Sequence, residues 1–211
     1  MASLPAPPLL VISDRSQARR PLVEIAAAAF AGGCRWFSLR EKDLSPEECR
    51  DLLRALVALG RRFGATITVH DDIEAAVAAG ADGVHLPGGG GPAAARRRLP
   101  VGLIGISAHS PQEAAAHLAA GADYVTLSPI FLTTSKPGYG PALGLDVLAE
   151  AARLSPGPVV APVIALGGIT ADNAAACLAA GASGIAAMGE IMRAADPEAA
   201  VRRFLIAIEK K

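Results

Sequence analysis

The segment Ala78-Ala79-Gly80-Ala81-Asp82-Gly83-Val84 recurs, with few changes, as Ala119–Val125 and Ala179–Ile185. Each copy ends an Ala-rich stretch at a glycine and then enters a short apolar run. A glycine just beyond a helix can adopt the left-handed conformation that caps it, and a short apolar run is typical of a buried strand. Each copy therefore predicts a step from a helix into a buried strand.

The same alternation of helix and strand extends through the whole chain. Eight short apolar runs alternate with eight amphipathic or Ala-rich segments, which predicts an α/β fold, a single (β/α)8 TIM barrel. An open doubly wound sheet is the alternative, although such sheets usually have fewer strands. The expected strands are Leu9–Ser13, Trp36–Arg40, Thr66–His70, Gly83–Leu86, Leu103–Ser107, Tyr124–Ser128, Val163–Leu166 and Gly184–Met188, and the expected helices span roughly 20–31, 46–63, 72–79, 92–98, 111–120, 144–154, 171–180 and 196–209.

Composition limits the classes of function. Of 211 residues 52% are hydrophobic and only 4% aromatic, so the chain has enough aliphatic side chains for a stable core. Twenty basic and twenty acidic residues balance, which indicates neither a nucleic acid nor a membrane surface as partner. No uncharged apolar run reaches the roughly 18 residues that span a bilayer. Three scattered cysteines are typical of reduced thiols in a cytoplasmic protein.

The chain start and the helix surfaces suggest the domain organisation. Residues 1–8 are rich in proline and lack the basic start of a signal peptide, so we expect a short disordered lead there. Residues 9–211 are expected to form the barrel domain. The Ala- and Leu-rich outer helices leave room for self-association into a homo-oligomer.

Cationic side chains are expected at the mouth of the barrel, where such folds place their chemistry. Arg40 and Lys42 stand two residues apart at the end of the second strand, so they face the same side. Lys136 lies in the long segment after the sixth strand. Guanidinium and ammonium groups suit phosphate oxygens, so these cations predict a polyanion site. The alternative is a set of surface ion pairs, in which Glu41 pairs with a neighbour.

Glycines after the last two strands suggest a second anion site. Gly167 and Gly168 precede an expected helix, and exposed amides at a helix start bind phosphate monoesters well. Gly189, after the eighth strand, would complete such a site. The alternative is a tight turn that simply needs the conformational freedom of glycine.

Two aspartates and two histidines complete the candidate set. Asp71 follows the third strand and could offer carboxylate oxygens to Mg²⁺, whereas Asp72 is interpreted as a helix cap. His85 lies within an apolar strand, which favours a hydrogen-bonded core histidine. His109 follows the fifth strand and is expected to face the mouth.

At this point the sequence resembles a known family. Leu39–Leu44, Gly80–Leu86, Gly121–Val125, Ser128–Phe131 and Ala165–Ala174 are similar, in order, to segments of the thiamine phosphate synthase and thiazole tautomerase superfamily. That family folds as a (β/α)8 barrel. Its synthase branch joins hydroxymethylpyrimidine diphosphate to a thiazole phosphate and releases diphosphate, whereas its tautomerase branch isomerises the thiazole phosphate.

The resemblance implies small phosphorylated heterocycles as substrates and Mg²⁺ as cofactor. It implies a role for each matched position: diphosphate on Arg40, Lys42, Ser128, Thr133, Ser135 and Lys136, Mg²⁺ on Asp71, and thiazole phosphate on Gly167, Gly168 and Gly189. Ser38, His70 and His109 complete the candidate substrate-binding residues.

The chain departs from the synthase pattern at several positions. Ser38 stands where the pattern has Gln, and His70 stands where it has Asn. Gly88–Gly91 replace a loop that carries a second carboxylate, which removes a metal ligand. Glu190 adds a negative charge beside the expected phosphate turn.

Three hypotheses follow. The first is a diphosphate-releasing synthase, because Arg40, Lys42, Asp71, Ser128 and Lys136 are all retained. The second is a tautomerase in which His70 or His109 moves the proton. The third is a catalytically silent barrel that binds a phosphorylated thiazole or serves as a scaffold.

Overall fold

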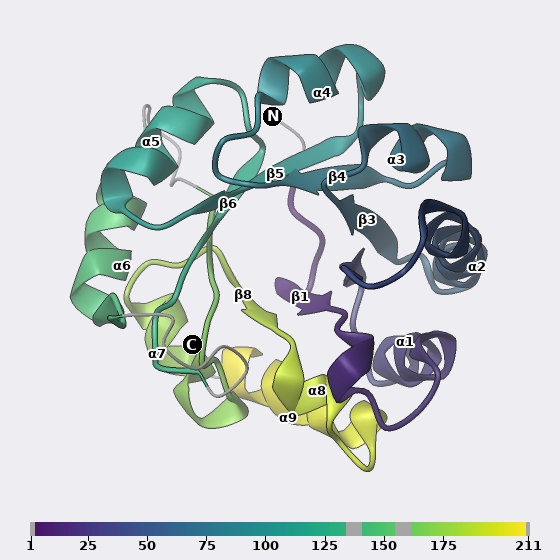
Figure 1. The fold of residues 1–211 in the computed structure, drawn as a ribbon. Helices are drawn as coiled ribbons and strands as arrows, with labels where there is room; N and C mark the ends of the chain where they lie inside the picture. Colours follow the sequence, from purple (N-terminus) through teal and green to yellow (C-terminus); the bar gives the residue numbers. More distant parts are fainter. Residues whose placement is uncertain (1–2, 134–140, 155–161, 210–211) are drawn as a thin grey trace.

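The fold is a closed barrel of eight parallel strands. A computed structural model describes residues 3–133, 141–154 and 162–209. Every strand pairs in parallel with its neighbours in chain order, and β8 (Gly184–Ala187) pairs with β1 (Leu9–Ile12) to close the cylinder. Figure 1 shows the helices as an outer ring around these strands. The predicted (β/α)8 barrel is therefore confirmed, and the open sheet is excluded.

The strands and helices alternate as the sequence predicts. The remaining strands are β2 (Trp36–Leu39), β3 (Thr66–His70), β4 (Gly83–Leu86), β5 (Leu103–Ala108), β6 (Tyr124–Leu127) and β7 (Val163–Ala165). The helices are η1 (Arg15–Gln17), α1 (Leu22–Ala31), α2 (Pro46–Phe63), α3 (Ile73–Ala79), α4 (Pro92–Arg98), α5 (Pro111–Ala119), α6 (Gly144–Arg153), α7 (Ala171–Ala179), α8 (Gly189–Met192) and α9 (Pro197–Glu209).

Two short helices at the mouth were not predicted. The η1 turn follows β1 and is capped by Asp14, whose side chain accepts a hydrogen bond from the Ser16 N–H. The α8 helix is a single turn after β8, too short to produce a periodic pattern in the sequence. Most expected strands also end one residue early, because residues such as Arg40 and Ser128 already belong to the loops of the mouth.

Side chains along each strand point alternately to the inside and to the outside of the barrel. On β2, Phe37 and Leu39 pack in the layer between strands and helices, whereas Trp36 belongs to the cluster inside the barrel. Because successive side chains of a strand point to opposite faces, Ser38 and Arg40 share the inner side with Trp36. The inner positions at the strand ends therefore form the floor and rim of the mouth.

One aromatic contact fills the centre of the barrel. The rings of Trp36 and Tyr124 meet edge to face with centroids 4.8 Å apart, and both side chains are fully buried. Gly105 lies beside Tyr124 in the β5–β6 register, and a Cβ at this glycine would overlap the tyrosine ring. The missing side chain thus gives Tyr124 the room to reach upward, toward the residues of the mouth.

The segment before β1 covers the opposite end of the barrel. Leu4 packs against the interior cluster, and the Pro8 carbonyl accepts a hydrogen bond from the Ile185 N–H at 3.0 Å. Leu4 and Pro8, which make these contacts, belong to the segment 1–8 that was expected to be a disordered lead. The contacts arise because the apolar barrel interior is open at this end and Leu4 can bury its side chain there.

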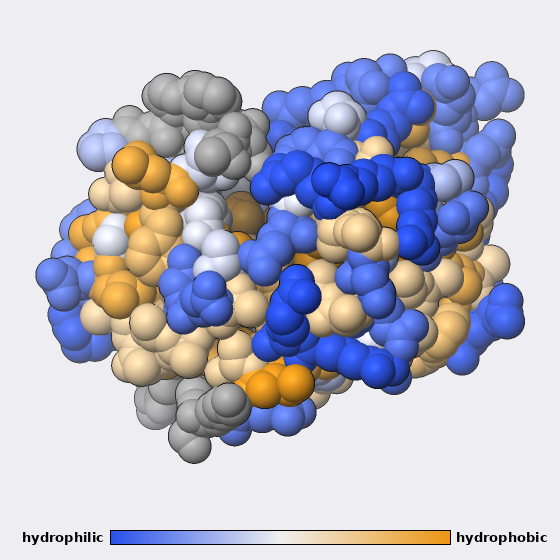
Figure 2. Space-filling view, turned by 90° about the horizontal axis from the view of Figure 1, so that it is seen from below, coloured by the Kyte–Doolittle hydropathy of each residue, from blue (hydrophilic) through white to orange (hydrophobic). Residues whose placement is uncertain are grey.

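The outer surface mixes charged and weakly apolar residues. Figure 2 shows one face of the molecule, where hydrophilic side chains are interspersed with weakly hydrophobic surface. Within the described ranges, no helix has the length and apolarity that crossing a bilayer requires.

The contact between Gly105 and Tyr124 makes a stability prediction. Gly105→Ala is expected to lower the free energy of unfolding by about 2 to 3 kcal/mol, because a methyl group is forced against a buried ring. Gly89→Ala is the control: a Cβ there meets no atom within 4 Å, so its change should stay within about 1 kcal/mol. Urea denaturation of both variants measures the difference, and equal midpoints would contradict the proposed packing.

Candidate active site at the barrel mouth

A pocket of about 300 Å³ lies at the carboxyl ends of the strands. Its walls come from the loops after β2, β3, β4, β5, β6 and β7, which are far apart in sequence. Most of the predicted site residues line it: Arg40, Lys42, His70, Asp71, His109, Ser128, Thr133 and Gly167. Predicted residues Ser135 and Lys136 lie outside the described part of the chain.

Ser38 is a predicted residue that the structure keeps away from this pocket. It is fully buried on the inner face of β2, two residues before Arg40. Two residues of strand correspond to roughly 7 Å, so Ser38 lies one layer deeper than the mouth. Its hydroxyl has no hydrogen-bond partner among the described residues.

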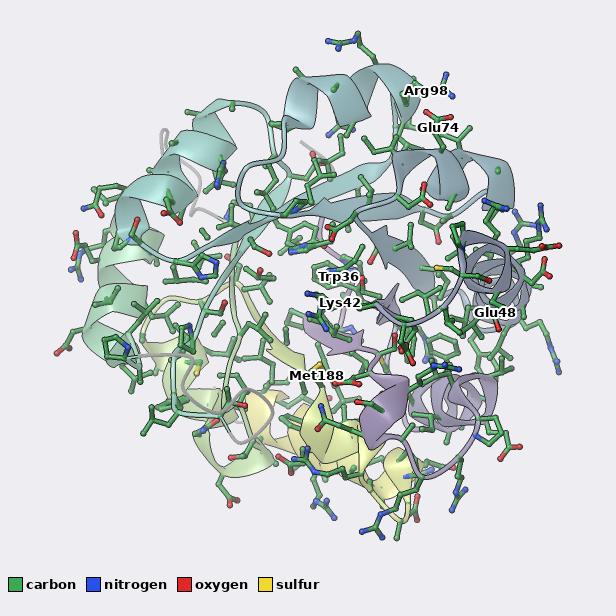
Figure 3. All side chains as sticks on the ribbon, in the orientation of Figure 1. Trp36, Lys42, Glu48, Glu74, Arg98 and Met188 are labelled. Carbon is green, nitrogen blue, oxygen red and sulfur yellow. The ribbon has the colours of Figure 1, made fainter. Side chains whose placement is uncertain are left out.

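Arg40 and Lys42 line the pocket without forming ion pairs to described residues. Figure 3 shows Lys42 and Met188 inside the ring of strands, whereas Arg98 and Glu74 pair with each other far outside it. The two mouth cations are therefore available to an anionic ligand.

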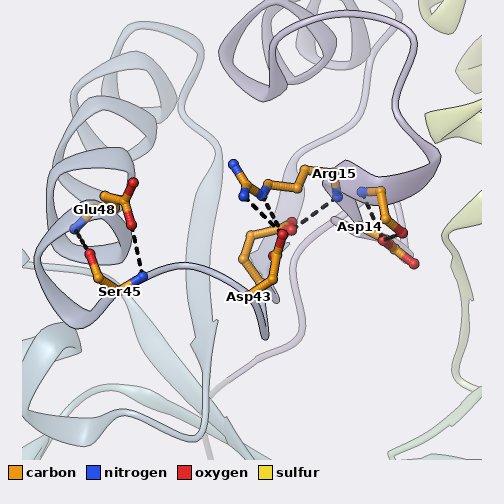
Figure 4. Close-up of polar contacts among 7 residues, drawn as sticks. Asp14, Arg15, Asp43, Ser45 and Glu48 are labelled. Carbon is orange, nitrogen blue, oxygen red and sulfur yellow. Dashed lines mark hydrogen bonds and ion pairs between the residues drawn. The ribbon is translucent and has the colours of Figure 1, made fainter.

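The alternative interpretation pairs Glu41 with a neighbouring cation, but among the described residues Glu41 forms no ion pair. Its carboxylate accepts hydrogen bonds from the Ser13 hydroxyl at 2.6 Å and from the Arg15 N–H at 2.9 Å. The Arg15 guanidinium in turn pairs with Asp43 at 2.8 Å, as Figure 4 shows. Burial raises the pKa of Glu41, while the Ser13 hydrogen bond opposes this rise. The loop after β1 thus holds the carboxylates that would otherwise neutralise the mouth.

His85 is the buried core histidine that the sequence predicts. Its Nδ1 lies 3.1 Å from the Tyr124 hydroxyl, and its Nε2 lies 3.0 Å from the Ser107 hydroxyl. Its ring packs against His70, with centroids 4.6 Å apart. Burial, assisted by the positive charge of Arg40, lowers the pKa of His85 to about 3. The side chain is therefore neutral at physiological pH and forms the floor of the pocket.

His109 faces the mouth with its ring orientation fixed. Its Nδ1 lies 2.9 Å from the Ser128 carbonyl oxygen, which can only accept, so Nδ1 carries a proton. Its backbone N–H donates to the Glu113 carboxylate at 2.7 Å, which anchors the loop after β5 to α5. In the neutral imidazole, Nε2 is then the basic nitrogen.

Asp71 has an unusual backbone conformation. Its φ is +63°, the one positive value among described non-glycine residues. The Asp72 N–H donates to the His70 carbonyl at 2.9 Å, which closes a tight turn around Asp71. Asp72 itself caps α3, because its carboxylate accepts the Ala75 N–H at 2.7 Å, as predicted. Backbone strain of this kind is concentrated at functional sites, and here it directs Asp71 to the pocket.

A second pocket of about 690 Å³ adjoins the first. Both are lined by Thr133, Leu166, Gly167 and Met188, and the second extends over the start of α7 to α8 and α9. Predicted residues Gly167, Gly168 and Gly189 all line it.

The turn from β7 to α7 requires its two glycines. Gly167 and Gly168 have φ values of +95° and +64°, and a Cβ on Gly167 would lie 2.7 Å from the Cα of Pro129. The Asn173 amide donates to the Gly168 carbonyl at 2.9 Å and accepts the Thr170 N–H at 2.8 Å. The tight-turn interpretation is thus confirmed, and the same turn exposes backbone N–H groups at a helix start.

Two arginines of the second pocket were missed by sequence reasoning. Arg193 follows Gly189 by one helical turn, and a Cβ on Gly189 would overlap its guanidinium. Arg203 comes from α9. The spacing of Gly189 and Arg193 was a usable signal once a helix was assigned there, whereas Arg203 required knowledge of how α9 packs.

Comparisons with known proteins agree on one family. The family model described as thiamine monophosphate synthase matches residues 9–191. A thiamine-phosphate synthase of Roseiflexus sp. is 40% identical over 195 residues, covering 91% of this chain and 81% of the relative. One of Moorella thermoacetica is 39% identical over 197 residues, covering 92% of each chain. A solved thiamine phosphate pyrophosphorylase from Pyrococcus furiosus superposes with a TM-score of 0.84 and 32% identity, over 96% of this chain and 95% of that one.

The neutral state of His85 predicts a pH effect on stability. Its pKa is about 3 in the folded protein and about 6.5 when exposed, so below pH 6.5 the unfolded chain binds the proton first. The free energy of unfolding should therefore fall as pH drops from 6.5 toward 3, by up to about 1.4 kcal/mol per pH unit. Chemical denaturation of wild type and His85→Gln across this range measures the contribution. The variant should show the shallower decline, and parallel curves would contradict the assignment.

Proposed function

The chain belongs to the thiamine monophosphate synthase family, and on that premise we propose that it catalyses the synthase reaction. Hydroxymethylpyrimidine diphosphate and a thiazole phosphate would be joined to thiamine phosphate, with release of diphosphate. The observation that carries the proposal is the pair of adjoining pockets at one barrel mouth, lined in common by Thr133, Leu166, Gly167 and Met188. Two separate anionic substrates could therefore lie side by side.

The mouth pocket suits the leaving diphosphate. Arg40 and Lys42 offer two positive charges without competing ion pairs among the described residues, and the Ser128 and Thr133 side chains border the same space. Charge-assisted hydrogen bonds to phosphate oxygens are among the stronger contacts available to a protein. Ser135 and Lys136 belong to this proposal through the family resemblance alone.

The second pocket suits the phosphate of the thiazole. The turn at Gly167 and Gly168 leads directly into α7, whose positive dipole end favours a phosphate monoester. Gly189 leaves the space beside this turn to the Arg193 guanidinium. The thiazole ring would then extend toward the mouth pocket, where both pockets meet.

The chemistry requires positioning and charge stabilisation more than a nucleophile. The C–O bond to diphosphate breaks with both electrons leaving on oxygen, and the thiazole nitrogen uses its lone pair to form the new bond to the pyrimidine methylene carbon. Arg40 and Lys42 would stabilise the charge that develops on the departing oxygen. Holding the two reactants in line removes much of the entropic barrier. Neutral His85 below the site adds no charge that would oppose the electron-poor carbon.

Asp71 fits the magnesium ion that this family requires. Of the described residues that line the mouth pocket, it is the only carboxylate. Mg²⁺ is usually held by one or two carboxylates together with substrate phosphates and waters, so a single aspartate beside a diphosphate site is sufficient. Bound there, the ion would neutralise negative charge on the leaving group.

A direct assay tests the proposed function. The purified protein, incubated with both substrates and Mg²⁺, is expected to form thiamine phosphate and diphosphate. Arg40→Gln and Lys42→Gln should each lower kcat by about a hundredfold, because each removes a charge from the leaving-group site. Arg98→Gln is the matched control, since Arg98 pairs with Glu74 on the outer surface and should leave the rate unchanged. Isomerisation of the thiazole phosphate without thiamine phosphate formation would show instead that the chain is a tautomerase.

The role of Asp71 makes a separate prediction. EDTA treatment should abolish turnover, and added Mg²⁺ should restore it. Asp71→Asn should need at least about tenfold more Mg²⁺ for half-maximal rate, because a neutral amide binds a hard cation less well. Asp51→Asn is the control, since Asp51 pairs with Arg54 on the surface of α2. Identical Mg²⁺ dependence of wild type and Asp71→Asn would remove Asp71 from the metal site.

A further inference from the structure

The second pocket contains a carboxylate where an anion would bind. Glu190, in the short helix α8, lines the pocket together with Gly168 and Gly189. The backbone N–H of Ala171, the first residue of α7, faces this carboxylate and acts to lower its pKa. Its other oxygen, Oε2, is buried without a hydrogen-bond partner among the described residues. Glu190 therefore occupies the helix start that a phosphate group would use.

The charges around Glu190 come from helices α7 and α9 and from the loop between α8 and α9. Arg193, just after α8, and Arg203 of α9 are the cations of the pocket, and Asp196 lies in the loop that joins these helices. Asp172 of α7 adds a second repulsive charge. Arg193 also donates a hydrogen bond to Gln17. With Glu190 ionised, the pocket lining is formally neutral, since two arginines balance Glu190 and Asp196.

We propose that Glu190 holds the phosphate position in the free protein, and that binding of a phosphate monoester there is coupled to uptake of a proton by Glu190. The inference rests on the function proposed above, because that function makes this pocket the phosphate subsite. A phosphate and an ionised Glu190 would compete for the same N–H group and repel each other. A protonated Glu190 would remove the repulsion and could donate a hydrogen bond to a phosphate oxygen.

The electrostatics of the pocket support this coupling. Burial raises the pKa of Glu190, while Arg203 and Arg193 act in the opposite direction. A bound dianion raises this pKa further, so Glu190 releases its proton at a higher pH in the complex than in the free protein. Between these two pKa values, anion affinity must rise as pH falls.

Sulfate is the probe for the experiment, because it stays doubly charged across the neutral range. All proteins tested carry Arg40→Gln and Lys42→Gln, so that the cations of the mouth pocket do not contribute. The parent is compared with Glu190→Gln and with Glu24→Gln, an exposed carboxylate on α1 that serves as the matched control. Titration calorimetry in buffers of different ionisation enthalpy gives both the dissociation constant and the number of protons taken up.

The parent should take up a proton on binding sulfate, with affinity rising as pH falls. Glu190→Gln should bind sulfate about tenfold more tightly above neutral pH, with no proton uptake and little pH dependence, since one pKa unit of coupling corresponds to a tenfold change. Glu24→Gln should match the parent. Equal proton uptake by parent and Glu190→Gln, or no sulfate binding by any of them, would overturn the proposal.

A turnover assay keeps this proposal separate from the proposed function. Proton-linked sulfate binding without thiamine phosphate synthesis by the wild-type protein would contradict the function and leave the coupling intact. Thiamine phosphate synthesis by the wild-type protein, with no difference between parent and Glu190→Gln in sulfate binding, would support the proposed function and contradict the coupling.

Discussion

The pairing of β8 with β1 is the constraint on which the candidate site depends. In an open sheet of the same strand order, β2 with its two cations and β8 with the residues before α8 would lie at opposite edges. Closure leaves only β1 between them, through the register Leu10↔Ala186 on one side and Leu10↔Trp36 on the other. Because all strands are parallel, their carboxyl ends share one rim. Closure therefore brings the two cations after β2 to the same rim as the second pocket.

The mouth stays cationic because nearby carboxylates are bound elsewhere. Ser13 and the Arg15 backbone hold Glu41, the Arg15 side chain holds Asp43, and Glu113 binds the His109 N–H. Each contact uses a carboxylate that stands close to Arg40 or His109 in the fold. Exposed ion pairs contribute little to stability, so these contacts matter chiefly for which charges they leave unpaired. For an anion site, it matters more that the cations have no ion-pair partners than that they are numerous.

Local sequence patterns were sufficient for the fold and for most of the mouth. Glycine-terminated helices entering apolar runs predicted the barrel, and two-residue spacing placed Arg40 and Lys42 on one face. The local sequence did not show how deep a side chain lies within the barrel. Ser38 points to the inner face, as Arg40 does, yet it lies one layer below Arg40 and is fully buried. Arg193 and Arg203 were missed because a single-turn helix leaves no periodic signal and because helix packing decides which side chains enter the pocket.

The positions at which the chain departs from the synthase pattern can be explained by how deep each residue lies in the barrel and by the charge that it carries. His70 replaces an amide with a ring that packs on neutral His85, so the substitution fills space above the core without adding a carboxylate. The glycines after β4 leave Asp71 as the sole acidic group among the described residues of the mouth pocket. Each pocket thus has a carboxylate at its proposed anion site: Asp71 in the mouth pocket, and Glu190 in the second pocket, where Asp196 adds a further carboxylate. Asp71 would hold a divalent cation that offsets the charge of a diphosphate, whereas Glu190 faces the start of α7, where the helix dipole already supplies positive potential. The second pocket therefore does not need a bound metal cation. The repulsion between a phosphate and Glu190 can then be relieved only if the Glu190 carboxylate is protonated or displaced.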